Sequence, residues 1–449
     1  MAQRIVASLA FVFLELFSGL CFSAPEKPPE NQLQLKLAVE KFKLNNGLNV
    51  LLYEDHSVPL VSYHTWFRVG SKNEKPGLTG MAHLFEHMMF KGTAKYPAER
   101  FDQILQANGA VNNAFTSNDY TGYYIDAPSD KLEVLMDLES DRMTHLEVTE
   151  ANLKSEREVV KEERRMRTEN SIQGTLFELI FGAVFKVHPY KWPVVGWMED
   201  LNRMKVSDCI AFYKKFYAPN NATLVIAGDI SISKTKALVE KFYGSLPAST
   251  TLEKSEYQVE PLQRGERARQ ISKEVQTPTI GVTFKTSKAG TDDAYALDLL
   301  SNILGAGESS RLHRRLVYKE QKALSMQAFN YTLQDDGIFG IITSLRSGIK
   351  EDPVLQGIFG EIWRVKQILI SEEELQKAKN SVMTDYVNSL KTIHGKGNII
   401  AMNETLFGDY QMFFKDLDKY NAVTREKIQT VAEQYLKPEQ RSIVRIYPK

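Results

Sequence analysis

The sequence has little cysteine and no excess of charge of either sign. Two cysteines, Cys21 and Cys209, occur in 449 residues, which excludes a small disulfide-rich scaffold. The 56 basic and 56 acidic residues cancel. We therefore expect neither a nucleic-acid binder that works through bulk charge nor a polybasic membrane-surface protein. Apolar residues make up 43% of the chain, which excludes disorder as its main state.

Long apolar runs are also scarce, and the longest lies at the amino terminus. Residues 5–20 are mostly apolar, follow Arg4 and precede small residues. This pattern predicts a signal peptide at 1–23, export to the periplasm, and a flexible lead-in at 24–40. The alternative is an uncleaved leader that anchors the chain to a membrane, although the run is short for a span. After cleavage the chain keeps one cysteine and forms no disulfide.

The remaining chain reads as two related halves. A polar, charged stretch at 250–274 predicts a linker between residues 41–249 and 275–449. The pattern of an aromatic residue, a proline and an apolar strand at 216–226 recurs 219 residues later. Both halves mix strands with long helices, so we predict an α+β fold built from two homologous α/β-layer halves.

Individual strands are indicated by apolar runs and turn residues. Asn45-Asn46-Gly47 separates two short apolar runs and predicts a hairpin. Residues 60–69 and 222–227 read as further strands, and residues 279–284 resemble 60–66. This last similarity again supports an internal repeat.

The segment 79–92 holds three ionisable side chains at spacings that suggest a functional site. On a helix, His83 and His87 lie one turn apart on one face, and Glu86 lies beside them. Thr79 is expected to cap the start of this helix, and Gly92 follows its end. The other positions are almost all apolar, so the helix is expected to be buried. Three ionisable groups there are costly unless they are paired.

A divalent metal would satisfy these groups. Two imidazoles at i,i+4 can reach one zinc ion, and a nearby carboxylate can deprotonate its water. The alternative is two satisfied core histidines and a buried salt bridge. A third ligand is expected from the acidic helix at 153–169, where Glu156 and Glu163 share a face. Glu163 is the candidate ligand, and Glu156 could orient a histidine. An i,i+4 pair of Glu163 with Arg167 is the alternative.

Through these residues the chain resembles the inverted-motif zinc peptidases, a family that includes pitrilysin, insulysin and the mitochondrial processing peptidase. The resemblance rests on His83-x-x-Glu86-His87 followed by Glu163 after 76 residues. Further segments resemble the family at 109–117, 156–163, 188–196 and 217–221. It extends from about Phe42 to the carboxyl terminus and is most similar to the short bacterial and mitochondrial branch.

The resemblance implies one Zn²⁺ per chain, held by His83, His87 and Glu163. It implies that Glu86 is the general base on metal-bound water and passes the proton to the leaving amine. Glu156 would support a histidine ligand from behind.

The resemblance also implies a clamshell whose two halves enclose a chamber for unfolded peptides. The substrate would add a strand to the edge formed by Asn113, Ala114 and Phe115. The predicted function is therefore that of a zinc metalloendopeptidase. No nucleotide is expected, because Gly305-Ala306-Gly307 lacks the Lys-Ser/Thr of a phosphate loop.

One departure from the family points to a partner. Active members carry an Arg and, seven residues later, a Tyr in the second half. The matching positions here are Val317 and Leu324, neither of which donates a hydrogen bond. Arg311 and Tyr318 have the right separation but lie six residues too early. We therefore predict a homologous partner subunit that supplies the Arg/Tyr pair in a heterodimer, with a homodimer as the other arrangement.

Two other classes of function remain open at the level of sequence. One is a non-catalytic structural subunit of a membrane-associated complex, as in relatives that lose the metal motif. The other is a zinc hydrolase that acts on substrates other than peptides.

Overall fold

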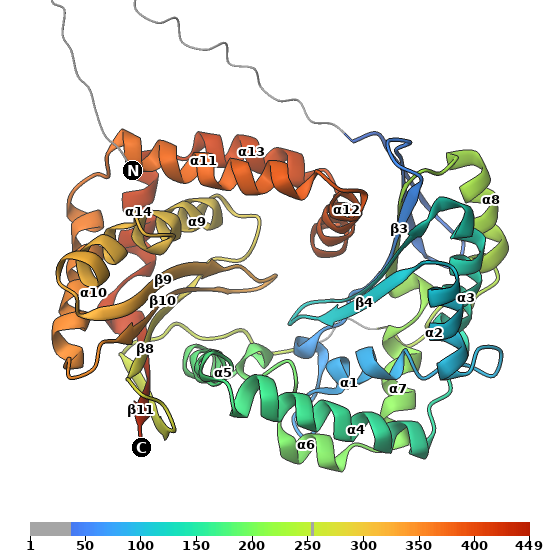
Figure 1. Ribbon diagram of the computed structural model, residues 1–449, viewed down its shortest axis with the longest axis horizontal. Helices are drawn as coiled ribbons and strands as arrows, with labels where there is room; N and C mark the ends of the chain where they lie inside the picture. Colours follow the sequence, from blue (N-terminus) through green and yellow to red (C-terminus); the bar gives the residue numbers. More distant parts are fainter. Residues whose placement is uncertain (1–36, 253–255) are drawn as a thin grey trace, which may run out of the picture. The chain divides into compact units, whose positions relative to one another are not determined.

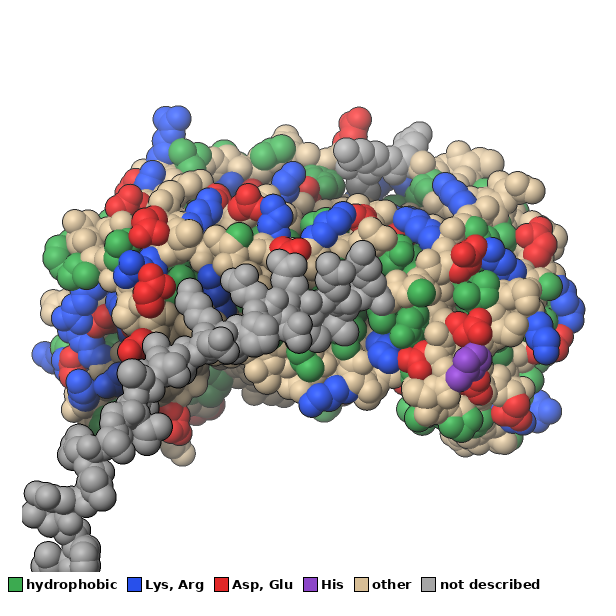
Figure 2. Space-filling view, turned by 90° about the horizontal axis from the view of Figure 1, so that it is seen from above, with side chains coloured by type: hydrophobic (Ala, Val, Ile, Leu, Met, Phe, Trp, Pro, Cys, Tyr) green, Lys and Arg blue, Asp and Glu red, His purple; other side chains and the backbone are tan. Residues whose placement is uncertain are grey.

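The computed structural model describes residues 37–252 and 256–449. The predicted signal peptide (1–23) and most of the lead-in lie outside these ranges. Within them, no helix combines the length and the apolar character that crossing a bilayer requires. Acidic and basic side chains are interspersed over the face shown in Figure 2, in keeping with the zero net charge.

Two β-sheets organise the described residues (Figure 1). The first has the order β1-β2-β6-β3-β5-β4 and consists of β1 (Val39–Lys43), β2 (Asn49–Glu54), β3 (Leu60–Phe67), β4 (Val111–Thr116), β5 (Thr121–Pro128) and β6 (Ala222–Gly228). The second has the order β7-β11-β8-β10-β9 and consists of β7 (Arg267–Lys273), β8 (Thr279–Thr286), β9 (Ala323–Tyr331), β10 (Gly337–Leu345) and β11 (Arg441–Pro448).

The two sheets share one topology. Apart from β1, the strands β2-β6-β3-β5-β4 correspond in order to β7-β11-β8-β10-β9. Within this shared order, β2 and β6 pair parallel, as do β7 and β11, and the remaining pairs are antiparallel. The first residues of β3 and β8 are 219 apart, as are those of β6 and β11. The predicted α+β fold of two homologous halves is confirmed.

Helices surround both sheets. Those of the first half are α1 (Met81–Met88), α2 (Ala98–Ala107), α3 (Leu132–His145), α4 (Glu150–Arg164), α5 (Ile172–Val184), α6 (Met198–Arg203), α7 (Val206–Phe216) and α8 (Ile232–Tyr243). Those of the second half are α9 (Asp292–Gly305), α10 (Glu351–Gln367), α11 (Glu372–Ser389), α12 (Ile393–Phe407), α13 (Met412–Ala422) and α14 (Arg425–Tyr435). Two π-helical segments, η3 (Arg165–Glu169) and η6 (His313–Lys319), follow α4 and precede β9.

One helix of each half packs against the sheet of the other half. Helix α12 packs on β3 and β6 of the first sheet, where Ile400 and Ala401 cover the buried Trp66 (Figure 1). Helix α5 packs on β8 and β11 of the second sheet, where Ile180 covers Val444. Burial of these apolar faces joins the halves, because each sheet completes its core with a helix from the opposite half.

The local predictions meet mixed outcomes. The hairpin around Asn45–Gly47 is confirmed: β1 pairs antiparallel with β2, and Gly47 has a φ of +91°. The predicted linker, 250–274, is wrong at its end, because residues 267–273 form strand β7. Of the strands that the structure describes, β7 pairs only with β11, at a sheet edge, and exposes much of its polar surface, so its sequence resembles a linker. The lead-in is likewise too long, since β1 begins at Val39.

Candidate metal centre and adjoining cleft

Helix α1 starts in a different way from the one predicted. Thr79 does not cap it. Its hydroxyl instead donates to Asp200 over 2.6 Å. Gly80 precedes the first turn with a φ of +88°, and a Cβ there would lie 2.6 Å from the carbonyl oxygen of Val195. The carboxylate of Glu74 accepts the free N–H groups of Gly80 and Ala82, both over 2.9 Å. Sequence reasoning missed this cap, because Glu74 precedes Gly80 by six residues and lies outside the usual capping positions.

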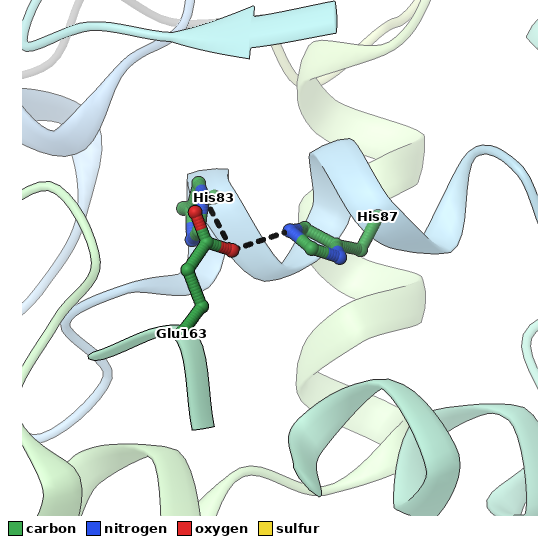
Figure 3. Close-up of side chains that lie close together, drawn as sticks. All are labelled: His83, His87 and Glu163. Atoms are coloured by element: carbon green, nitrogen blue, oxygen red, sulfur yellow. Dashed lines mark ion pairs between the residues drawn. The ribbon is translucent and has the colours of Figure 1, made fainter. Parts of the chain in front are cut away.

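The predicted ligands converge. His83 and His87 lie on one face of α1, and α4 places Glu163 against them (Figure 3). The Oε2 atom of Glu163 lies 3.2 Å from Nε2 of His87 and 3.7 Å from Nε2 of His83. One ligand atom from each residue lies within 4.8 Å of the other two. Among the residues that the structure describes, this is the one such group of histidine, cysteine and carboxylate side chains.

These separations fit a zinc ion. Tetrahedral zinc with bonds of 2.0–2.1 Å keeps its ligand atoms about 3.4 Å apart, and the two distances to Glu163 bracket that value. Burial lowers the pKa of His83 to about 4, so its imidazole is neutral, as metal binding requires. The Nδ1 atom of His83 is buried without a hydrogen-bond partner in the described chain.

The charge balance around His87 also favours a cation. Burial opposes protonation of His87, but the carboxylates of Glu156 and Glu163 outweigh it and raise its pKa to about 9. The site therefore holds a positive charge between two carboxylates. A divalent ion meets the same demand once this proton leaves.

The two readings of Glu163 are compatible. Its Oε2 atom faces the histidines, while its Oε1 atom lies 2.7 Å from Nη1 of Arg167. A carboxylate has two oxygens and serves both partners. The interactions with His87, His83 and Arg167 keep the pKa of Glu163 below its usual value.

Glu156 lies behind His87. Its Oε2 atom is 3.4 Å from Nδ1 of His87, and its Oε1 atom is 2.6 Å from Nζ of Lys91. Sequence reasoning missed Lys91, although it follows His87 by four residues just past the end of α1.

Glu86 faces the same space. Burial raises the pKa of its carboxyl group, and the hydroxyl of Thr116 donates to its Oε2 atom over 2.6 Å. Thr116 ends strand β4 and was also missed, because only the tertiary fold brings it to α1.

A cavity of about 670 Å³ connects these groups with a free sheet edge. Strand β4 ends the first sheet, and among the described strands it pairs only with β5, so no described residue occupies its other edge. Asn113, Ala114 and Phe115 line the cavity together with the three candidate ligands and Glu86. A second hollow shares Glu86, His87, Asn113 and Ala114 and extends the cleft toward α2.

The second half contributes little to this cavity. Val317 packs against the hydrophobic core of the second half, and Leu324 is exposed. Neither residue lines the cavity. Arg311 forms two 2.7 Å hydrogen bonds with Glu374, and Tyr318 is exposed. Of the described residues after 256, only Tyr331 at the end of β9 lines the cavity. Sequence reasoning did not identify Tyr331.

Fold and site together define a class of protein with two related α+β halves, of which the first carries a histidine–carboxylate group that could hold a metal ion. At the 219-residue offset, His83, Glu86 and His87 correspond to Asn302, Gly305 and Ala306, which offer neither imidazole nor carboxylate. Two family models match the chain. "Insulinase (Peptidase family M16)" covers residues 49–196, and "Peptidase M16 inactive domain" covers 203–382. The chain belongs to peptidase family M16.

Individual relatives agree over nearly the whole chain. It is 33% identical to the zinc protease PqqE of Helicobacter pylori over 424 residues, which cover 91% of this chain and 93% of that protein. A crystal structure of a protease from Helicobacter pylori has 30% identity and a TM-score of 0.87, with 92% of this chain and all of that chain covered. The periplasmic protease PqqL from Escherichia coli shares the fold at 19% identity. Its TM-score is 0.77, and the match spans 92% of this chain and 48% of that chain.

Proposed function

We propose that this chain is a zinc-dependent endopeptidase that hydrolyses unfolded peptides. One observation carries the proposal: His83, His87 and Glu163 converge in a cavity that also holds Glu86 and the open edge of β4. Residues 41–249 would form the zinc-bearing half and residues 275–449 the second half.

The open edge of β4 would bind the substrate. An extended peptide adds a strand there, and the backbone N–H and C=O groups near Asn113 to Phe115 satisfy its polar groups. Backbone pairing is independent of side chains and requires an extended segment, which suits unfolded peptides. It also favours a peptidase over other hydrolases, because a substrate without a peptide backbone gains nothing from a free edge.

Glu86 would move the proton during cleavage. Zinc held by His83, His87 and Glu163 would act as a Lewis acid on the scissile carbonyl and lower the pKa of water. The Glu86 carboxylate accepts the proton of the attacking water and delivers it to the amine nitrogen as the C–N bond breaks. Burial raises the pKa of Glu86, which suits a group that must both take and return a proton. Thr116 holds one of its oxygens.

Two measurements test the peptidase. Metal analysis of the purified chain is expected to give one zinc per chain. An unfolded reporter peptide is expected to be cut by the protein and not by Glu86→Gln. A chain that binds no zinc would instead be a structural subunit, and one that binds zinc but cuts no peptide would be a different hydrolase. The retained ligand set argues against the structural role.

A homologous partner would complete the site. Positions 317 and 324 offer no donor, so a related subunit is proposed to supply an Arg/Tyr pair in a heterodimer. The chain alone is then expected to bind zinc but to cleave peptides poorly. Robust cleavage without any partner would contradict the heterodimer and leave the peptidase intact.

Export to the periplasm is part of the proposal. It rests on the leader at 1–23, and the Escherichia coli protein that shares the fold is named periplasmic. Cell fractionation and amino-terminal sequencing of the purified protein test it. An uncleaved leader in the membrane fraction would favour the anchored alternative.

A further inference from the structure

The second half carries a strongly basic hollow that the proposed peptidase does not use. Its volume is about 440 Å³, and the residues that line it are Arg311, Arg314, Arg315, Lys319, Glu361 and Arg364. Five cations therefore face one carboxylate in a chain whose net charge is zero. All six residues lie in or just before η6 and in α10, away from the metal ligands on α1 and α4.

Carboxylates hold three of these arginines in place. Arg311 forms its two 2.7 Å hydrogen bonds with Glu374. Arg315 lies 2.7 Å from Glu320 and 3.1 Å from Glu361, and Glu361 also pairs with Arg364. Guanidinium groups that are already oriented lose little further freedom when they bind a ligand.

The other two cations have no partner. Among residues 37–252 and 256–449, nothing forms a hydrogen bond or an ion pair with the side chain of Arg314 or Lys319, and both residues are exposed. Elsewhere, exposed cations such as Lys95 and Lys241 pair with nearby carboxylates. The hollow thus keeps two uncompensated positive charges beside three fixed guanidinium groups.

We propose that this hollow binds a phosphate-bearing ligand. A phosphate group carries up to two charges on several oxygens and accepts hydrogen bonds from several guanidinium groups at once. The hollow is larger than one phosphate, so it has room for an attached organic group. This binding is separate from peptide cleavage and does not depend on it.

Two sources of phosphate fit this chemistry: a soluble phosphate ester and a phospholipid headgroup. The exposed rings bear on the second source. Tyr318 is 77% exposed next to Lys319, and Trp363 is 59% exposed next to Arg364. Amphipathic rings beside cations are typical of surfaces that meet the headgroup region of a membrane.

The test uses the full chain and two probes at constant ionic strength. Glycerol 3-phosphate is titrated by calorimetry, and vesicles of phosphatidylglycerol are compared with vesicles of phosphatidylcholine by flotation. The double variant Arg314→Gln/Lys319→Gln is expected to bind the effective probe at least about tenfold more weakly. The control Lys154→Gln/Lys234→Gln removes the same charge from exposed lysines of the first half that pair with no described residue, and it is expected to bind like the unchanged protein.

Each outcome decides the proposal. Saturable binding of glycerol 3-phosphate identifies a soluble ester as the source. Binding only to phosphatidylglycerol vesicles identifies the headgroup. The absence of binding to both probes overturns the proposal, as does an equal loss of binding in the control variant, which would show bulk charge alone. All four substituted residues are exposed, and their side chains pair with nothing in the described part of the chain, so circular dichroism is expected to show an unchanged fold for both variants.

Discussion

The carboxylate of Glu163 contacts two sets of partners, the histidines of the candidate metal site and Arg167, and these contacts differ in their exposure to solvent. One oxygen faces His83 and His87, and the other faces Arg167. The ion pair is weakly held, because the Arg167 side chain is 78% exposed and exposed pairs contribute little free energy. The contact with the histidines is better shielded from water, because the side chains of His83 and His87 are 10% and 21% exposed.

Substitution of each partner separates these tasks. Glu163→Gln is expected to weaken zinc binding by at least about 100-fold, since even groups behind a ligand contribute about 10–100-fold. Arg167→Gln is expected to change zinc affinity by no more than about fivefold. Competition with a chelator measures both. A large loss of zinc in Arg167→Gln with little loss in Glu163→Gln would favour the structural ion pair over the metal site.

Glu86 lies beside the ligands without joining them, so its loss should spare the metal. Glu86→Gln keeps the shape of the side chain and its contact with Thr116 but removes the proton acceptor. We expect peptide cleavage to fall by about 10²–10⁴-fold while zinc content stays at one per chain. Glu158→Gln on the exposed face of α4 is the control. Cleavage unchanged in Glu86→Gln would assign the proton transfer to another group.

At the scale of the element, the sequence predicts which residues share a face of a helix, but it does not predict which elements come into contact. The i,i+4 histidines and the seven-residue spacing of Glu156 and Glu163 identify faces of α1 and α4 from the sequence alone. The hydrogen bond from Thr116 to Glu86 joins segments 30 residues apart, and Tyr331 reaches the cavity from the other half of the chain. A one-dimensional pattern carries no record of such contacts.

Helices α9 and α13 show how packing makes stability depend on pH. Tyr295 of α9 donates to Asp416 over 2.5 Å, and Tyr420 of α13 donates to Asp298 over 2.7 Å. Burial raises the pKa of both aspartates to about 6. The value in the unfolded chain is about 4, so the folded state binds the proton more tightly. The cost of ionisation is therefore complete above pH 6 and is lost as the pH falls toward 4.

Removal of one of these charges should stabilise the protein at neutral pH. Asp416→Asn is expected to increase the free energy of unfolding by about 1 kcal/mol at pH 7.5, with the gain gone by pH 4. Thermal melts at both pH values measure it. Asp418→Asn, on the exposed side of α13, is the control and is expected to have no such dependence. An equal loss of stability at both pH values would show that the ionised carboxylate is needed for its hydrogen bond.

At the scale of the whole molecule, the two halves are held together by the exchange of α5 and α12, each of which packs on the sheet of the opposite half. Without α12, the first sheet would expose Leu51, Trp66 and Val225, which are almost fully buried. Without α5, the second sheet would expose Ile338 and Val444. Helix α12 also approaches closely at Gly397, where a Cβ would lie 2.6 Å from Nε2 of His64. Exposed apolar surfaces of this kind favour association.

The halves are therefore expected to depend on one another for folding. Residues 37–249 and 256–449, produced separately, are expected to be insoluble or to bind a hydrophobic dye strongly. Co-expression is expected to restore a soluble complex, because both exchanged helices then find their sheets. Gel filtration and dye fluorescence measure this. Two soluble, monomeric halves with native circular dichroism would show that the exchanged helices are dispensable.

The exchanged helices also bear on how this gene can change. Helix α12 follows the candidate metal ligands in the chain by more than 200 residues, yet it covers the sheet of their half. A nonsense mutation after residue 249 is therefore expected to expose the apolar face of the first sheet, although it alters none of His83, His87 and Glu163.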